Sequence, residues 1–271
     1  MNVRRTPWLV VFSLSVSLCA AAGAFAQTAQ TPSTPFEPQV GQAGKDVVWV
    51  PTPQALVDAM LEMTRVTPQD YVIDLGSGDG RTVITAAKRG ATALGIEYNP
   101  DMVELARRNA VAAGVTAKAT FAKADLFESD FSKADVITMF LLPSINMQLR
   151  PKLLDLKPGT RLASNTFTME DWVADDTRTI DGDCSGWCTA LLWIVPAKVA
   201  GTWEMPQGTL TLTQKFQQIS GTLGSAPIAD AVLRGDDIAF TAANVRYSGK
   251  VTGNSMKGTV AGGTAWTATK R

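Results

Sequence analysis

Glycines and carboxylates are concentrated in the stretch Val72–Arg81, and their types and spacing suggest chemistry. The apolar run Tyr71–Leu75 predicts a buried strand, and the segment Arg81–Arg89, followed by Gly90, predicts a helix. Glycines between a strand and a helix let a ligand approach the main chain closely. Doubly wound α/β sheets bind cofactors at this place, beyond the carboxyl end of a strand.

The spacing of the glycines distinguishes between ligand classes. A dinucleotide site has the pattern G-x-G-x-x-G and holds a pyrophosphate at the helix N-terminus. Here Gly76, Gly78 and Gly80 form the pattern G-x-G-x-G, with Asp74 before it and Asp79 inside it. The two carboxylates would repel a pyrophosphate and suit a ligand with a cationic or neutral polar end. The alternative is a tight turn that binds nothing, and we favour the ligand.

Two later acidic residues follow predicted strands. Glu97 lies about one strand–helix–strand unit after Asp74, where a carboxylate can accept hydrogen bonds from both ribose hydroxyls of a nucleoside. Its alternative role is electrostatic stabilisation of the helix predicted from Pro100, and we favour the ribose role. Asp125 could accept a hydrogen bond from an adenine amino group, with Leu126 packed near the ring, or it could cap a turn. Both interpretations of Asp125 stay open.

Composition excludes several kinds of chemistry. The chain has 271 residues, a formal net charge of zero and no long basic run, so a nucleic-acid partner is not indicated. It contains no histidine, which excludes histidine general bases, histidine-containing triads and histidine metal sites. Proton transfer therefore depends on carboxylates, lysine, tyrosine or water. No metal site is predicted.

The N-terminus has the organisation of a secretory signal. Arg4 and Arg5 precede the apolar run Trp8–Ala22, and Ala24–Ala26 has the small-x-small pattern of a cleavage site. The apolar run is short for a membrane span. We therefore expect residues 1–26 to be a signal peptide cleaved after Ala26, export to the periplasm, and no stable membrane span afterwards.

The mature chain would keep two cysteines, Cys184 and Cys188. In an exported protein a close pair of this kind predicts a disulfide. Free thiols or half of a metal site are the alternatives. The metal alternative is poor because no further cysteine or histidine is present to complete the site.

The rest of the chain divides into three parts. Residues 27–46 are rich in Pro, Thr, Gln, Ala and Gly and predict a flexible leader. Residues 47–198 alternate strand and helix patterns, which predicts a Rossmann-like, doubly wound, mostly parallel α/β domain. Residues 199–271 contain short alternating segments separated by glycines, which predicts a small antiparallel β domain, a meander or a barrel. We expect this part to stabilise the protein or bind a partner.

Several short motifs occur in an order that supports a family resemblance. The stretch from Asp74 to Arg81 resembles the first motif of class I S-adenosylmethionine-dependent methyltransferases. The chain also resembles bacterial exported methyltransferase-domain proteins and, more distantly, the mitochondrial protein-lysine methyltransferases that act on the ATP synthase c subunit and the adenine nucleotide translocase. The runs that carry this resemblance are Val50–Pro53, Asp74–Arg81, Gly95–Glu97, Asp125–Phe127, Leu149–Leu154 and Phe167–Trp172.

The resemblance implies roles for individual residues. The cofactor would be S-adenosylmethionine, with its methionine part near the glycine turn, its ribose at Glu97 and its adenine at Asp125. The implied cofactor-binding residues are Asp74, Gly76, Ser77, Gly78, Asp79, Glu97, Tyr98, Asp125 and Leu126. The implied substrate-side residues are Thr52, Pro53, Phe140, Leu141 and Pro143. No residue identifies itself as a base, so no catalytic residue is assigned.

The resulting functional hypothesis is an S-adenosylmethionine-dependent methyltransferase acting on a protein, at lysine side chains. The alternative is an exported, non-catalytic binding or scaffold protein that retains the fold. A nicotinamide dehydrogenase is disfavoured by the spacing of the glycines.

Overall fold

The computed structural model describes residues 1–2, 36–182, 184 and 186–271. Residues 3–35 lie outside the described residues, and with them nearly all of the predicted signal peptide and the first part of the predicted leader. Among the helices of the described ranges, none is both long and apolar enough to cross a membrane.

A seven-stranded sheet forms the centre of the first domain, in the order β3-β2-β1-β4-β5-β7-β6. The first five strands in this order are parallel, β7 runs antiparallel to β5, and β6 runs antiparallel to β7. This topology confirms the predicted Rossmann-like, mostly parallel sheet. The strands are β1 (Tyr71–Leu75), β2 (Thr92–Glu97), β3 (Ala119–Lys123), β4 (Val136–Met139), β5 (Arg161–Asn165), β6 (Asp176–Thr179) and β7 (Thr189–Ile194).

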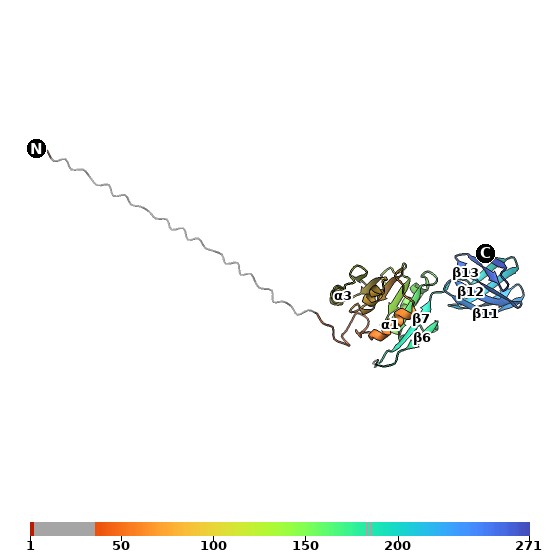
Figure 1. The fold of residues 1–271 in the computed structure, drawn as a ribbon, viewed down its shortest axis with the longest axis horizontal. Coiled ribbons are helices and arrows are strands. Elements are labelled where there is room, and N and C mark those ends of the chain that lie inside the picture. The colour runs from red at the N-terminus through yellow and green to blue at the C-terminus, as the bar shows by residue number, and fades with distance from the viewer. Residues whose placement is uncertain (3–35, 183, 185) are drawn as a thin grey trace. The chain divides into compact units, whose positions relative to one another are not determined.

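Four helices of the described part of this domain cover the two faces of the sheet: α1 (Gln54–Met63), α2 (Arg81–Lys88), α3 (Pro100–Ala112) and α4 (Pro143–Leu154). Apolar residues of α1, α2 and α3 pack on one face, and α4 packs on the other. In Figure 1, α1 lies beside β7, which it contacts. Burial of both faces explains why β1 and β4 are almost continuously apolar.

The start of α1 and the strand β6 differ from what the sequence pattern predicts. The pattern of Thr52 and Pro53 favours Thr52 as the helix cap, but Pro53 occupies the cap position and Thr52 is buried against the sheet. There the Thr52 hydroxyl accepts a hydrogen bond of 3.3 Å from the Asn165 amide. Strand β6 escapes sequence analysis because its four residues are all exposed and have no apolar alternation.

The C-terminal domain is a closed antiparallel barrel of eight strands, β8 to β15. Its strands β11, β12 and β13 are labelled in Figure 1. Inward-facing aromatic side chains pack against one another in its centre, so the barrel has a side-chain core. The strands are β8 (Gly201–Met205), β9 (Gly208–Lys215), β10 (Gln218–Leu223), β11 (Ala226–Arg234), β12 (Asp237–Ala242), β13 (Val245–Thr252), β14 (Ser255–Val260) and β15 (Ala265–Lys270).

Candidate functional site

A cavity of about 530 Å³ opens at the carboxyl ends of β1, β2 and β4, a volume typical of small-molecule sites. Most residues that the sequence nominated line it. Those lining residues are Thr52, Asp74, Gly76, Ser77, Gly78, Asp79, Glu97, Tyr98, Asp125, Leu126, Phe140 and Leu141. Pro53 and Pro143, also nominated, begin helices beside the cavity and are not among its lining residues.

The turn after β1 requires glycine for two reasons: its backbone angles are left-handed, and neighbouring side chains leave little room for a Cβ atom. Gly76 and Gly78 have φ angles of 75° and 52°, in the left-handed region that side chains disfavour. A Cβ atom on Gly78 would lie 2.8 Å from Nε1 of Trp49, and one on Gly76 would lie 3.1 Å from a methyl group of Leu141. The bare backbone of this turn therefore forms part of the cavity wall.

Asp74 places a buried carboxyl beneath this turn. Its side chain accepts a hydrogen bond of 2.6 Å from the Thr138 hydroxyl and has no ion-pair partner among the described residues. Burial raises the pKa of Asp74 to about 7, against the lowering effect of the Thr138 hydrogen bond, and the negative charges of Asp79 and Glu97 raise it further. Nearby, the buried Ser77 hydroxyl has no hydrogen-bond partner among the described residues. The turn thus presents to a ligand the Asp74 carboxyl, which has no ion-pair partner among the described residues, and the Ser77 hydroxyl, which has no hydrogen-bond partner among them.

Asp79 of the glycine turn is linked through Arg81 to the segment before α1. Arg81 Nη2 lies 2.6 Å from a carboxylate oxygen of Asp79. Arg81 Nη1 donates a 2.8 Å hydrogen bond to the backbone carbonyl of Thr52. The guanidinium group therefore partly neutralises Asp79, whereas Asp74 has no cationic partner in the part of the chain that the structure describes.

Glu97 is held at the end of β2 by two backbone N–H groups. Its carboxylate oxygens accept hydrogen bonds of 2.9 Å from Gly78 N and of 2.9 Å from Asn99 N. The cap of α3 is Asn99, which accepts a hydrogen bond of 2.9 Å from Asp101 N. Each carboxylate oxygen of Glu97 keeps further acceptor capacity for hydroxyl groups of a ligand in the cavity.

Asp125 performs the turn-capping role that the sequence left open. One carboxylate oxygen accepts a 2.9 Å hydrogen bond from Phe127 N, and the other forms an ion pair with Lys45. The hydrogen bond from Lys45 and the one from Phe127 N hold the pKa of Asp125 below its ordinary value. The carboxylate still lines the cavity, beside Leu126.

Part of the segment 27–46, which the sequence assigns to a leader, forms a wall of this cavity. Gly41 N donates to Trp49 O at 2.8 Å, and Trp49 N donates to Gln42 O at 2.9 Å, which folds residues 42–49 into a tight loop. Residues 42–52 all line the cavity. Sequence reasoning places Thr52 at the site but assigns residues 42–46 to the leader, because that stretch has no apolar periodicity.

An aromatic group lies in the other half of the cavity. Phe140 stacks on Phe167 with ring centroids 5.7 Å apart, and Trp187 meets Phe140 edge-on at 5.9 Å. The three residues stand at the ends of β4, β5 and β7, whereas Asp74 and Glu97 stand at the ends of β1 and β2. The strand order therefore separates an acidic half of the cavity from an aromatic half. Of these three rings, sequence reasoning had placed only Phe140 at the site.

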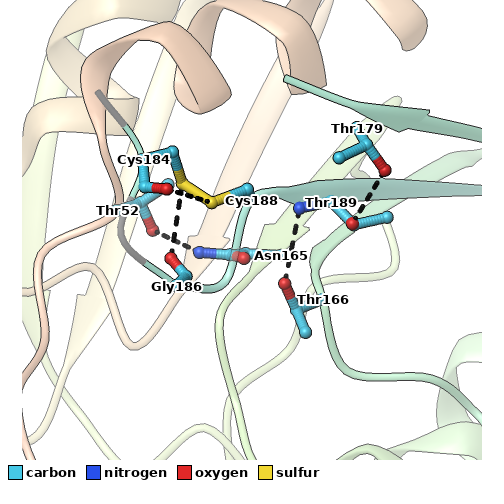
Figure 2. Close-up of a disulfide and its surroundings, with 8 residues drawn as sticks. All are labelled: Thr52, Asn165, Thr166, Thr179, Cys184, Gly186, Cys188 and Thr189. Atoms are coloured by element: carbon cyan, nitrogen blue, oxygen red, sulfur yellow. Dashed lines mark hydrogen bonds between the residues drawn. A yellow bond between two sulfur atoms is a disulfide. The ribbon is translucent and has the colours of Figure 1, made fainter. Parts of the chain in front are cut away.

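A disulfide closes the loop that carries Trp187. Cys184 and Cys188 are bonded with their Cα atoms 5.8 Å apart, directly before β7, as Figure 2 shows. The metal alternative for these cysteines is thereby removed. Within the described ranges, no group of three His, Cys, Asp or Glu side chains is placed to hold a metal ion.

Comparison with known proteins identifies relatives of this α/β domain. The model of the ANTKMT methyltransferase domain matches residues 74–176. A protein-lysine N-methyltransferase of Saccharolobus islandicus is 46% identical over 129 residues, which are 46% of this chain and 80% of that protein. The Mus musculus lysine N-methyltransferase named for the ATP synthase c subunit is 37% identical over 130 residues, 48% of this chain; the chain spans about half (52%) of that protein.

A solved structure with the same fold contains a ligand. The crystal structure of an RNA methyltransferase from Salinibacter ruber in complex with S-adenosyl-L-homocysteine is 47% identical, with a TM-score of 0.52. The match covers 55% of this chain and 96% of that chain. The relatives are thus named for methyl transfer to different classes of acceptor.

Proposed function

We propose that this chain, which belongs to the family of the ANTKMT methyltransferase domain, transfers a methyl group from S-adenosylmethionine to lysine side chains of a protein. The family membership makes the chain an S-adenosylmethionine-dependent methyltransferase. The observation that carries the lysine acceptor is the 46% identity, across 80% of its length, with the archaeal protein-lysine N-methyltransferase.

The acidic half of the cavity fits the cofactor. S-Adenosylmethionine carries an ammonium group and a sulfonium group, and either positive charge would stabilise the ionised form of Asp74. Ser77 has a buried hydroxyl without a partner among the described residues, and Glu97 has acceptor capacity for the two ribose hydroxyls. Asp125 and Leu126 line the same cavity, and we assign the adenine to them.

The aromatic half of the cavity suits the acceptor. S-Adenosylmethionine supplies an electrophilic methyl group on a positively charged sulfur. The chain must orient the acceptor nitrogen in line with that methyl group and exclude water from both. The aliphatic lining by Met139 and Leu141 favours the neutral amine of lysine over its ammonium form, because burial disfavours the charged form. Positioning and desolvation account for the reaction without an assigned base.

We also propose that the protein is exported and cleaved after Ala26. The pattern of residues 1–26 supports this, and so does the disulfide between Cys184 and Cys188, because disulfides persist in oxidising compartments. Cell fractionation followed by N-terminal sequencing tests the proposal. A periplasmic protein that begins at Gln27 supports it, and a cytosolic protein with an intact N-terminus contradicts it.

Methyl transfer is tested with the mature chain, Gln27–Arg271, in its oxidised form. The protein is incubated with S-adenosylmethionine labelled in its methyl group and, separately, with envelope proteins and total RNA of the source organism. Acid hydrolysis and mass spectrometry then identify the labelled residue. The variants Asp74→Asn and Glu97→Gln should lose activity, whereas Glu104→Gln, the same change on an exposed face of α3, should not.

Label in methyl-lysine supports the proposed acceptor. Label in RNA would replace lysine with a nucleotide acceptor and agree with the name of the Salinibacter relative. No label in either fraction, from a protein that binds S-adenosylmethionine, would favour the non-catalytic alternative.

A further inference from the structure

We propose that Trp187, held in place by the Cys184–Cys188 disulfide, completes an aromatic subsite with Phe140 and Phe167 that binds the nitrogen end of the acceptor side chain as it gains positive charge. The subsite deepens the proposed function and rests on it for the identity of the acceptor as lysine. It would make acceptor binding depend on an intact disulfide.

The three rings come together from separate segments at the edge of the cavity. Phe140 follows β4, Phe167 follows β5, and Trp187 precedes β7. Phe140 and Phe167 are half-buried, and Trp187 is 46% exposed, so the subsite is open to an incoming side chain. Aromatic faces attract cations, and tryptophan does so most strongly. The group therefore has the composition of a site for an ammonium or methylammonium group.

Phe167 is held by buried polar side chains. Its backbone carbonyl accepts a hydrogen bond of 2.7 Å from the Ser164 hydroxyl and one of 3.2 Å from the Asn146 amide. Asn146 and Ser164 are fully buried. Buried hydrogen bonds of this kind fix a local conformation, because breaking them leaves polar groups unsatisfied. Phe167 and the stacked Phe140 thus form a fixed platform.

Trp187 is held through its backbone, by constraints on the next residue. Its φ angle is 53°, in the left-handed region that a bulky residue rarely adopts. Such conformations persist where the surroundings enforce them, and they often occur at functional sites. Here the next residue, Cys188, is fixed twice: by the disulfide and by its carbonyl, which accepts a 2.9 Å hydrogen bond from Ile180 N. Opening the disulfide would let the Trp187 backbone relax and the ring leave the platform.

Residues drawn around the disulfide include one that lines the cavity. Figure 2 draws it with Thr52 and Asn165, whose side chains are hydrogen-bonded to each other, and Thr52 lines the cavity. Trp187 and both cysteines lie beyond residues 74–176, which the family model matches. The disulfide-held ring is therefore a feature of this chain outside the matched domain, on the acceptor side of the site.

The reaction itself explains why an aromatic subsite helps. The lone pair of a neutral lysine nitrogen forms the new N–C bond while the S–C bond breaks, and the bonding electrons return to sulfur. Positive charge thus moves from sulfur to nitrogen, and a proton leaves the nitrogen to solvent afterwards. The rings stabilise charge that grows at the nitrogen during transfer, which is the requirement for lowering the barrier.

The subsite is tested by binding, independently of turnover. The probes are N-acetyl-trimethyl-lysine amide and its neutral isostere, in which carbon replaces the charged nitrogen. Calorimetry is done on the oxidised mature chain saturated with S-adenosylhomocysteine. The cationic probe should bind about tenfold more tightly than the isostere, the range expected for a cation on partly desolvated aromatic rings. Trp187→Leu should remove this difference, and Trp187→Phe should keep part of it.

The role of the disulfide is tested with the double variant Cys184→Ser/Cys188→Ser. It should lose the selectivity for the cation as Trp187→Leu does, while its affinity for S-adenosylhomocysteine stays within about twofold of wild type. Dithiothreitol, which converts the disulfide to two thiols and is itself oxidised to a cyclic disulfide, should have the same effect on wild type. It should change nothing in the double variant.

Equal binding of the two probes by oxidised wild type, or full selectivity in Trp187→Leu, would overturn the subsite. Full selectivity in the double serine variant would overturn the role of the disulfide. Methyl-lysine formation that Trp187→Leu leaves unchanged would retain the proposed function and reject the subsite. If the protein methylates only RNA but still prefers the cationic probe through Trp187, the subsite would be retained and the proposed lysine acceptor rejected.

Discussion

Because the pKa of the Asp74 carboxyl is raised, we predict that the protein binds S-adenosylmethionine more tightly as the pH rises toward 7.5. In the free protein the pKa of Asp74 is about 7, so much of the protein holds a proton there at pH 6. The cationic ligand favours the ionised carboxylate, so binding releases this proton. If the pKa in the complex returns to about 4, the ordinary value for an aspartate, affinity should rise about 25-fold between pH 5.5 and 7.5, as linkage requires.

The composition of the chain makes this pH dependence measurable. The sequence has no histidine, so no imidazole titrates in the same range. The amino group of the ligand has a pKa of about 8, which sets the upper limit of the series. Calorimetry at pH 6.5 in two buffers of different ionisation enthalpy should show release of about 0.8 of a proton from a group with a pKa near 7.

A matched pair of variants assigns the proton. Asp74→Asn should bind S-adenosylmethionine weakly at pH 7.5, with little change in affinity down to pH 5.5. Asp237→Asn, the same change on an exposed residue of β12, should behave as wild type. Wild-type affinity that stays constant from pH 5.5 to 7.5 would refute the reasoning.

The raised pKa of Asp74 also affects the stability of the protein without ligand. The folded-state pKa of Asp74 is raised, so its contribution favours folding most below pH 4 and is lost as the pH rises through about 7. A difference of about three pKa units corresponds to ~4 kcal/mol as an upper limit. The wild-type free energy of unfolding, measured against that of Asp74→Asn, should therefore fall between pH 4 and pH 7. A constant difference between the two proteins over this range would contradict the assignment.

Three further predictions concern other parts of the chain. Glu97→Gln should weaken S-adenosylmethionine binding by roughly 10- to 150-fold, since charged hydrogen bonds contribute about 1.5–3 kcal/mol. Glu104→Gln should leave the calorimetric affinity unchanged. Gly78→Ala should cost about 1–3 kcal/mol of backbone strain and displace Trp49, so a titration should show weaker cofactor binding; unchanged binding would contradict the tight turn. Trp203→Ala should destabilise the barrel by about 3–5 kcal/mol in denaturant unfolding, because the Trp203 indole is fully buried and donates a hydrogen bond of 2.8 Å to Val199 O. A loss of stability below about 1 kcal/mol would contradict a packed barrel core.

The α/β fold and the acidic half of the site could be predicted because their signals are local. The strand, the glycines and the carboxylates of residues 71–81 are consecutive, and Glu97 follows one strand–helix–strand unit later. Parallel strands then bring their carboxyl ends to one edge of the sheet. The strands of the C-terminal domain were visible in the same way, through their alternation and turn residues.

The aromatic half and the cavity wall depend on contacts between distant segments. Trp187 reaches Phe140 only because β7 pairs with β5, and nothing in its neighbourhood except the cysteines indicated a site. The loop that ends at Trp49 has no helical or strand periodicity, yet Trp49 packs against Gly78 of the glycine turn. Closure of the barrel depends on β15 pairing with β8, at opposite ends of the domain.

A structure of the oxidised mature chain with S-adenosylhomocysteine bound would show whether the two halves of the cavity hold cofactor and acceptor as proposed. We predict the amino end of the ligand beside Asp74 and the glycine turn, its ribose hydroxyls on Glu97, and its sulfur facing Phe140 and Trp187. Ribose hydroxyls placed away from Glu97, or a sulfur that faces away from the aromatic rings, would contradict this assignment.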